Sequence, residues 1–233
     1  MSNPMYSEHA AAYAQAIRDN SYNASYDRPS LLALLPPELN GMKVLDLGCG
    51  PGVYAEILLS RGAEVTAVDQ SAEMVALVEQ SLGDAVQCYS QDLAEGLPRE
   101  ADAAYSVVIC PLMLHYLKDF SPLLAEIRRV LKAGGLFVFS THHPFVDYGF
   151  SPSGNYFLTE KIIDEWNTVG QPVRVEYYRR PLSEIIQPLI DAGFQITALS
   201  EGQPDERMRQ SDPDSYQRLS TSPGFLFVKC QVG

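Results

Sequence analysis

Three glycines stand at alternate positions directly after a short apolar run that contains one acidic residue. Together they read Val44-Leu45-Asp46-Leu47-Gly48-Cys49-Gly50-Pro51-Gly52. Apolar residues at helical spacing follow from Val53, so the glycines are predicted to lie where a buried strand turns tightly into a helix. Glycine permits a positive φ, and its missing Cβ lets a ligand approach the N–H groups that begin the helix. This stretch therefore predicts a binding turn for a nucleotide-like ligand.

Two further acidic residues follow the next predicted strands. Asp69 ends the run Val65-Thr66-Ala67-Val68, and Asp92 follows the strand candidate 85–89. In open α/β sheets the ligand lies beyond the carboxyl ends of the strands, where a carboxylate can accept hydrogen bonds from ribose hydroxyls. The spacing G-x-G-x-G differs from the dinucleotide fingerprint G-x-G-x-x-G, because Val53 occupies the position of its last glycine. The three acids at successive strand ends suit adenosine without phosphates.

The motifs VLDLGCGPG, AVDQS and SQDL resemble those of the class I S-adenosylmethionine-dependent methyltransferases, strongly over residues 20–142 and loosely over the remainder. The resemblance implies that Asp69 holds the ribose hydroxyls and that Asp46 orients the turn or meets the methionyl ammonium. It places the other cofactor contacts at Gly48, Cys49 and Gly50 beside the methionyl part, Gln70 and Met74 beside the adenine, Asp92 and the Leu93 N–H at the adenine edge, and Cys110 at the strand end that faces the methyl. S-adenosylmethionine is thus the predicted cofactor.

The N-terminal segment 1–40 is rich in tyrosine and alanine and is predicted to be a helical lid. Helices around 9–18 and 29–35 leave the stretch 22–29 as a loop with many hydrogen-bonding side chains. Related methyltransferases use such a segment over the cofactor carboxylate, and this assigns Tyr26 and Arg28 to cofactor contact. The alternative is that the tyrosines only pack the added helices on the sheet edge.

Residues 144–180 hold eight aromatic side chains, a density well above the 10% of the whole chain. This inserted segment follows a strand at the ligand edge, where binding segments commonly lie on a rigid scaffold. It is predicted to be a substrate cap, with Tyr156, Trp166 and Tyr177 as acceptor contacts and His115 joining them from the segment after strand 104–110. An aromatic mini-core that stabilises a long connection is the alternative.

His142 and His143 follow the predicted strand 136–140 at the same edge of the sheet. Successive strand residues point to opposite faces, so only one of the two imidazoles can face the reacting methyl. Imidazole titrates near neutral pH and can take a proton from a phenol or an ammonium. Either histidine is therefore a candidate catalytic base, with plain packing as the alternative, and no metal-ligand set is predicted.

Strand and helix signals alternate along the chain, which is typical of a parallel sheet with helices on both faces. We expect one domain over 1–233, with a helix over 121–131 that stops at Gly134-Gly135 and a final pair of strands, 194–199 and 225–230, joined by a polar loop. In the family that the sequence resembles, this pair completes a doubly wound α/β fold. Its seven-stranded, mainly parallel sheet has the order 3-2-1-4-5-7-6, with the last-added strand antiparallel.

The charge balance excludes some partners. A net charge of −12 with only 17 Lys and Arg residues argues against a nucleic-acid substrate. No apolar run approaches 18 residues and no signal peptide is recognisable, so the sequence predicts a cytoplasmic protein without membrane contact, monomeric or homodimeric. The predicted acceptor is a small, partly apolar or aromatic molecule, methylated on O, N or C. A nicotinamide-dependent oxidoreductase, disfavoured by Val53 and the terminal strands, and a non-catalytic S-adenosylmethionine-binding module remain alternatives.

Overall fold

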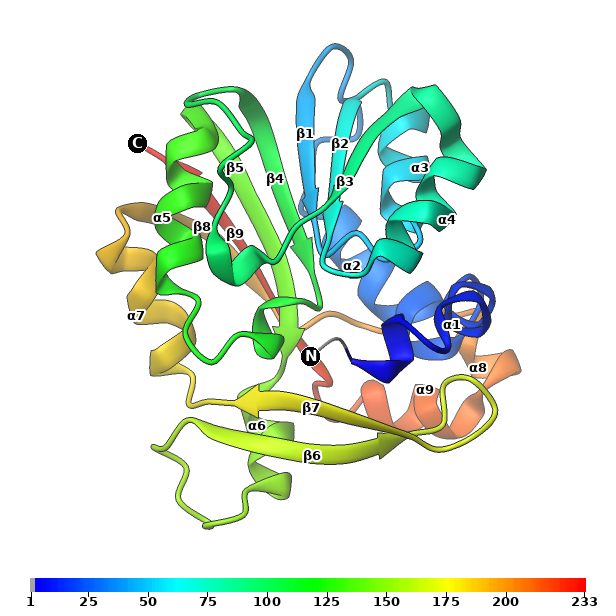
Figure 1. Ribbon diagram of the computed structural model, residues 1–233. Coiled ribbons are helices and arrows are strands. Elements are labelled where there is room, and N and C mark those ends of the chain that lie inside the picture. Colours follow the sequence, from blue (N-terminus) through cyan, green and yellow to red (C-terminus); the bar gives the residue numbers. More distant parts are fainter. Residues whose placement is uncertain (1–2) are drawn as a thin grey trace.

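A seven-stranded sheet organises the chain, and helices cover both of its faces (Figure 1). This computed structural model describes residues 3–233. The strands are β1 Lys43–Leu47, β2 Glu64–Asp69, β3 Val86–Ser90, β4 Tyr105–Pro111, β5 Leu131–His142, β8 Phe194–Ser200 and β9 Phe225–Val232. Their order is β3-β2-β1-β4-β5-β9-β8, and β9 is antiparallel to both neighbours while the pairs from β3 to β5 are parallel. Counted within this sheet alone, the order is 3-2-1-4-5-7-6, which confirms the predicted doubly wound α/β fold.

The central strands are apolar because both of their faces are covered. Leu45 and Leu47 of β1 belong to a core shared with helices α5 and α7, whereas Val44 belongs to a second core shared with α2, α3 and α4. This alternation places successive residues of one strand in different layers. The helices in chain order are α1 Ala10–Ala16, α2 Arg28–Leu32, α3 Val53–Ser60, α4 Ala72–Leu82, α5 Ser121–Val130, α6 Pro144–Asp147, α7 Ser183–Asp191, α8 Met208–Ser211 and α9 Pro213–Leu219. None of the helices within residues 3–233 combines the length and the apolar character that a membrane crossing requires.

The stretch 22–29 is helical, so the predicted loop there is wrong. A π-helical turn, η2 Asn23–Asp27, runs directly into α2. The side chain of Asn20 accepts a hydrogen bond from the Asn23 N–H at 2.7 Å, and Pro29 falls in the first turn of α2, where its missing N–H costs nothing. Asparagine and proline, interpreted as turn residues, here begin a helix.

Two predicted boundaries in the second half of the chain also differ. Helix α5 ends at Val130, and Gly134-Gly135 lie inside β5 instead of terminating the helix. The expected polar loop 201–223 contains the short helices α8 and α9. Helix α9 begins at Pro213, and the side chain of its N-cap, Asp212, accepts from the Ser215 N–H at 3.1 Å.

A separate two-stranded hairpin lies across the carboxyl end of the sheet (Figure 1). Strand β6 Glu160–Trp166 pairs antiparallel with β7 Val173–Arg179. The apolar side chains of the hairpin pack with Met5 of the N-terminal turn η1 Pro4–Tyr6, and they form a third small core apart from the two of the main sheet. The N-terminal segment and the hairpin are therefore packed together over the edge at which the predicted site lies.

Candidate cofactor and acceptor site

The turn after β1 brings three glycines with positive φ to the carboxyl edge of the sheet. The φ angles are +72° at Gly48, +53° at Gly50 and +86° at Gly52. A Cβ atom on Gly48 would lie 2.6 Å from Met113 Cγ, whereas one on Gly50 would have no neighbouring atom within 4 Å. Gly48 is thus required by packing, and the space beside Gly50 is open to a ligand.

Asp69 is anchored beside this turn. Its Oδ2 accepts from the Gly50 N–H at 2.8 Å, and its Oδ1 accepts from the Ser71 N–H at 2.9 Å. Burial raises the pKa of Asp69, and the backbone hydrogen bonds oppose that effect. A carboxylate offers about four lone-pair sites, so two remain for further donors. The geometry suits a carboxylate that accepts hydrogen bonds from two ribose hydroxyls.

Asp46 is a buried carboxylate without a partner. It is fully buried, and neither side-chain oxygen is hydrogen-bonded among the described residues. Burial, and secondarily the nearby Asp69, raises the pKa of Asp46 to about 8. An isolated buried charge is costly, and a cationic ligand group would relieve that cost. The methionyl ammonium of S-adenosylmethionine is such a group, so Asp46 fits the predicted cofactor.

Arg28 and Tyr26, both predicted to contact the cofactor, differ in whether they keep a free hydrogen-bonding group. Arg28 donates through Nη2 to the Ile17 carbonyl at 2.7 Å, but its buried Nε has no partner within residues 3–233. Tyr26 donates to the Glu201 carbonyl at 2.5 Å and accepts from the Gly224 N–H at 3.0 Å, and its ring is completely buried. Arg28 therefore has a free donor for a carboxylate, whereas the geometry of Tyr26 favours the packing alternative.

Asp27 is a residue of this site that the sequence analysis missed. Its two oxygens accept from the Ser140 hydroxyl of β5 and the Tyr54 hydroxyl of α3, both at 2.6 Å. Burial raises the pKa of Asp27 to about 6, although both hydrogen bonds and the neighbouring Arg28 lower it. Asp27 thus joins the N-terminal segment to β5 and to α3, the helix that follows the glycine turn. Its acidic type was visible in the sequence, but its two distant partners were not.

The remaining predicted cofactor residues lie around the ends of β1 to β4. Gln70 Nε2 donates to Asp92 Oδ2 at 2.9 Å, and Asp92 Oδ1 accepts from the Ala94 N–H at 2.9 Å. The other members of this group, Cys49, Met74, Leu93 and Cys110, are buried. Asp92 keeps lone pairs for further donors, while the four buried residues can offer backbone groups or apolar surface.

His115 and His142 form a stacked imidazole pair at the ends of β4 and β5. Their ring centroids are 4.0 Å apart and their planes differ by 19°. The ring of His142 also lies 4.7 Å from Tyr177 and 5.8 Å from Trp166. Neither ring nitrogen of His115 has a hydrogen-bond partner in the part of the chain described, and burial, His142 and Arg180 hold its pKa well below the usual range. The imidazole pair thus presents a neutral His115, stacked on His142, to an aromatic enclosure.

Tyrosines from outside the predicted segment complete this enclosure. The hydroxyls of Tyr6 and Tyr116 lie 2.5 Å apart, and the Tyr116 ring lies 4.3 Å from that of His115. The carbonyl of Tyr6 accepts from the Ser71 hydroxyl at 2.6 Å, directly beside Asp69. The N-terminal turn thus connects the glycine-turn region with the imidazole pair. No local signal places Tyr6 at this site, because Tyr116 and Ser71 are distant from it in sequence.

His143 faces away from the imidazole pair. Its Nδ1 accepts from the Phe145 N–H at 3.2 Å and caps α6, and its Nε2 lies 2.9 Å from Glu201 Oε1. Because Nδ1 accepts, Nε2 carries the proton and donates to Glu201. The alternation expected at the end of the strand therefore places His142, and not His143, against His115.

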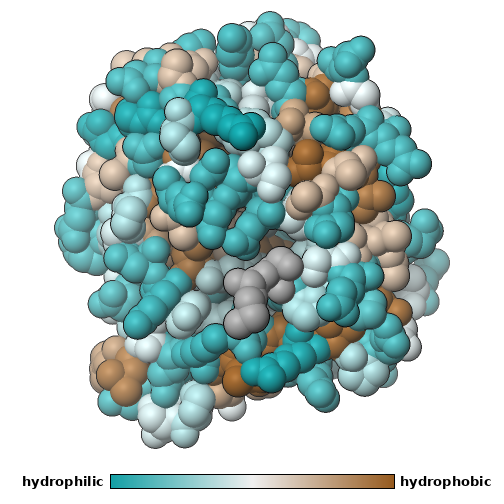
Figure 2. Space-filling model, in the orientation of Figure 1, coloured by the Kyte–Doolittle hydropathy of each residue, from teal (hydrophilic) through white to brown (hydrophobic). Residues whose placement is uncertain are grey.

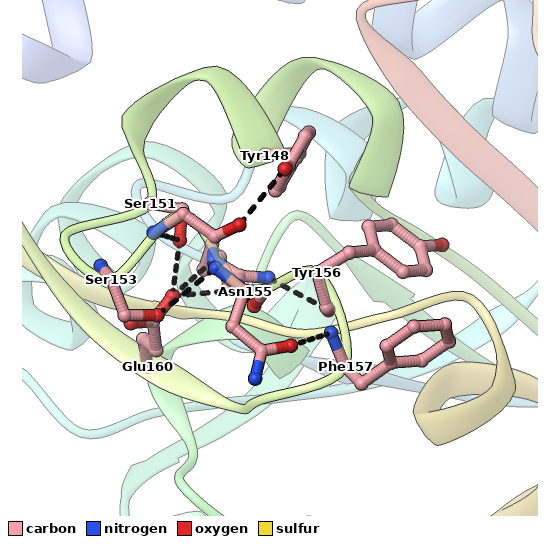
Figure 3. Close-up of polar contacts among 9 residues, drawn as sticks. Tyr148, Ser151, Ser153, Asn155, Tyr156, Phe157 and Glu160 are labelled. Atoms are coloured by element: carbon pink, nitrogen blue, oxygen red, sulfur yellow. Dashed lines mark hydrogen bonds and ion pairs between the residues drawn. The ribbon is translucent and has the colours of Figure 1, made fainter.

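Tyr156 lies in the loop between α6 and β6, near Phe157 and Glu160 (Figure 3). Its hydroxyl accepts from the Leu182 N–H at 3.0 Å, and its ring contacts Tyr148 and Phe157. The loop is fixed by Glu160, which accepts from Ser151 Oγ at 2.6 Å and from the buried Arg179 Nε at 2.7 Å. The structure does not bring Tyr156 to the imidazole pair as it does Trp166 and Tyr177.

A family model described as "Methyltransferase domain" matches residues 45–139, a span that contains the glycine turn, Asp69 and Asp92. The match shows that the chain contains a methyltransferase domain, and it confirms the predicted resemblance to the class I S-adenosylmethionine-dependent methyltransferases. S-adenosylmethionine is the cofactor of this methyltransferase. The match and the similar solved structures support a methyltransferase over the nicotinamide-dependent oxidoreductase and the non-catalytic module.

Several known proteins are similar to the methyltransferase. A solved S-adenosylmethionine-dependent methyltransferase of Mesorhizobium loti is 25% identical, with a TM-score of 0.72 over 92% of this chain and 99% of that one. An uncharacterized protein of Haemophilus influenzae is 28% identical over 93% of this chain and 92% of its own length. Ubiquinone biosynthesis O-methyltransferase of Pseudomonas putida is 39% identical and malonyl-[acyl-carrier protein] O-methyltransferase of Erwinia billingiae is 35% identical. These two alignments cover only 45% and 52% of those relatives.

Proposed function

We propose that the methyltransferase transfers a methyl group to oxygen or nitrogen of a small, partly aromatic acceptor. The observation that carries the proposal is the imidazole pair, enclosed by Tyr177 and Trp166 at the sheet edge that also holds the glycine turn. An aromatic enclosure binds a planar or apolar molecule, and a neutral imidazole accepts a proton from a hydroxyl or an amine. The printed names of the two O-methyltransferase relatives favour oxygen.

S-adenosylmethionine supplies an electrophilic methyl group on a sulfonium, so the chain has mainly to align the acceptor and exclude water. We propose that Asp69 holds the ribose, Asp46 the ammonium, Arg28 the carboxylate, and Asp92 with Leu93 the adenine. His142 accepts the acceptor's proton. A bond forms between the acceptor atom and the methyl carbon, and the carbon–sulfur bond breaks with its electron pair remaining on sulfur. We propose that the N-terminal turn and the hairpin, which pack together beside the imidazole pair, cover both ligands.

Cofactor binding should release a proton from Asp46. With a pKa of about 8, this carboxyl is largely protonated at pH 7, and a bound ammonium favours its charged form. We expect the wild type to release close to one proton, measured by calorimetry at pH 7 in buffers of different ionisation enthalpy. Asp46→Asn should bind more weakly and release none, while the exposed control Asp102→Asn behaves as the wild type. Equal proton release in Asp46→Asn and the wild type would exclude Asp46 as the partner.

The same carboxyl should make stability without cofactor depend on pH. Burial raises the pKa of Asp46 from 3.8 in the unfolded chain to about 8 in the folded one. The contribution of Asp46 to the free energy of unfolding is therefore fully present below about pH 4. It falls by about 1.4 kcal/mol per pH unit as the pH rises from 4 to 8, and it is lost above the folded pKa. In thermal melts at pH 9, the melting temperature of Asp46→Asn should be higher than that of the wild type. A wild type that melts higher at pH 9 would contradict this assignment.

The acceptor site is tested with Trp166→Ala, and Phe157→Ala is the control. Trp166 lies beside His142, whereas Phe157, in the same segment, is 80% exposed. Phenols and amines are screened with S-adenosylmethionine labelled on the methyl group, and the kinetic constants of a methylated acceptor are then compared. We expect Trp166→Ala to raise KM about tenfold or more with the cofactor Kd unchanged, because a partly buried aromatic contact is lost. An unchanged KM in Trp166→Ala would place the acceptor elsewhere.

A further inference from the structure

Asp147, at the end of the short helix α6, is a buried carboxylate with few partners. Its exposed fraction is 6%, and its side chain makes no hydrogen bond within residues 3–233. The basic group nearest to it is His142, whose Nδ1 lies 3.4 Å from Asp147 Oδ1. The two atoms are at ion-pair distance but are not aligned as a hydrogen bond. Contacts of catalytic groups often tighten only when the ligands bind.

The local fold directs Asp147 towards His142. His143 caps α6 through Nδ1, and its carbonyl accepts from the Asp147 N–H at 3.0 Å. The short helix thus turns the chain back, so that the residue five positions after His142 faces the His142 ring. Glu201, whose side chain is largely exposed, accepts from His143 Nε2 at 2.9 Å on the other side and adds little to this cap. His143, although it faces away from the imidazole pair, therefore determines where Asp147 lies.

The stack with His115 restricts the orientation of His142. The two rings are nearly parallel at 4.0 Å, and Phe225 lies on another side at 5.9 Å. With Nδ1 held towards Asp147, the other nitrogen of the ring, Nε2, is left free of that carboxylate. A carboxylate at one nitrogen of an imidazole favours the tautomer with hydrogen on that nitrogen and stabilises the cation that forms when the other nitrogen is protonated.

We propose that Asp147 is a positioning residue that holds the Nδ1–H tautomer of His142 and stabilises its imidazolium during methyl transfer. The proposal rests on the proposed role of His142 as the base. In this step the acceptor's proton moves to Nε2, Nδ1 keeps its own hydrogen, and Asp147 stays ionised. The other ionisable groups that face His142 are His115 from the turn η5 Leu114–Tyr116 and Tyr177 from β7, with Arg180 behind His115.

Nuclear magnetic resonance tests the tautomer without an acceptor. The chain has four histidines, so the ring nitrogens of protein labelled with 15N-histidine can be resolved and His142 assigned by its loss in His142→Gln. With S-adenosylhomocysteine bound at pH 9, the wild type should show His142 with hydrogen on Nδ1. Asp147→Ala should lose this preference, and Asp147→Asn should retain part of it. Glu201→Ala is the matched control, since it removes the carboxylate of His143 and should leave His142 unchanged.

Turnover of an acceptor found in the screen provides the second measurement. Asp147→Ala should lower kcat about tenfold to thousandfold and move the acidic limb of the pH profile, with the cofactor Kd preserved and partial rescue in Asp147→Asn. An unchanged His142 tautomer in both Asp147 variants overturns the proposal. If the tautomer changes but His142→Gln keeps full turnover, the positioning contact stands and the role of His142 as base fails. A fall in kcat without any change in the pH profile would make Asp147 merely structural.

Discussion

Asp69→Ala should weaken S-adenosylmethionine binding by at least about a hundredfold. The proposed pair of hydrogen bonds from the ribose to this carboxylate contributes about 1.5–3 kcal/mol each, and every 1.4 kcal/mol is a factor of ten in Kd. Asp69 is already oriented by the Gly50 and Ser71 N–H groups, so it loses little freedom when the ligand binds. Titration calorimetry measures the affinity, and circular dichroism confirms that the variant is folded.

A second variant separates ligand contact from support of the turn. Asp69→Asn keeps an oxygen for one of the two backbone N–H groups but loses the charge, so its affinity should fall between those of Asp69→Ala and the wild type. Asp102→Ala, an exposed acid paired with Arg129, is the control and should bind normally. Unchanged affinity in a folded Asp69→Ala would refute the assignment of Asp69 to the ribose.

Stretches whose structure is set by near neighbours were predictable. The run from Val44 to Gly52 specifies a buried strand, a turn with positive φ and a helix start within nine residues, and the structure has all three there. The sheet order followed from the resemblance, because the rhythm of strands and helices alone leaves several windings open. Asp46 and Asp69 could be named in advance since strand ends in a parallel sheet share one edge.

The contacts that the sequence did not predict join residues that are far apart in the chain. Tyr26 belongs to a helix and not to a loop, and its hydroxyl is bound by backbone about 175 to 200 residues away. Tyr6 meets Tyr116 across 110 residues. The imidazole pair joins a residue after β4 to one at the end of β5, and neither local pattern indicates a stack. Hydrophobic periodicity and composition indicate which face of a helix or strand is buried. These contacts depend instead on how the complete helices and strands pack together.

The hairpin shows why an aromatic segment was hard to interpret. Its residues were predicted to form either a cap or a mini-core, and the structure shows a small core and largely exposed aromatic side chains in one segment. Val173, Val175 and Tyr177 form a small core with Met5, while Tyr177 also contacts His142. Other aromatics of the segment, Phe145 and Phe157 among them, are largely exposed, and apolar residues are visible along the lower part of the face in Figure 2, where the hairpin and its loop lie. Composition alone cannot sort these positions.

His142→Gln should lower turnover by about a hundredfold to ten-thousandfold while leaving the cofactor affinity intact. His142 is the histidine that the structure stacks against His115 and surrounds with Tyr177 and Trp166, so the loss of its ring removes the proposed proton acceptor. Glutamine is similar in size and polar, but it cannot act as a base near neutral pH. The kinetics are measured with saturating cofactor across pH 6 to 9, on an acceptor from the screen.

His143→Asn is the matched control for this variant. Asparagine is a favourable N-cap, so it can still accept from the Phe145 N–H and keep α6 in place while the imidazole is removed. We expect its turnover to stay within a few-fold of the wild type with an unchanged pH profile. The wild-type rate should fall at acid pH, where the base is protonated, and His142→Gln should lose this limb because no base remains to be titrated. If both variants lose less than a few-fold and keep the wild-type profile, alignment alone drives methyl transfer and the imidazole pair serves only to shape the acceptor site.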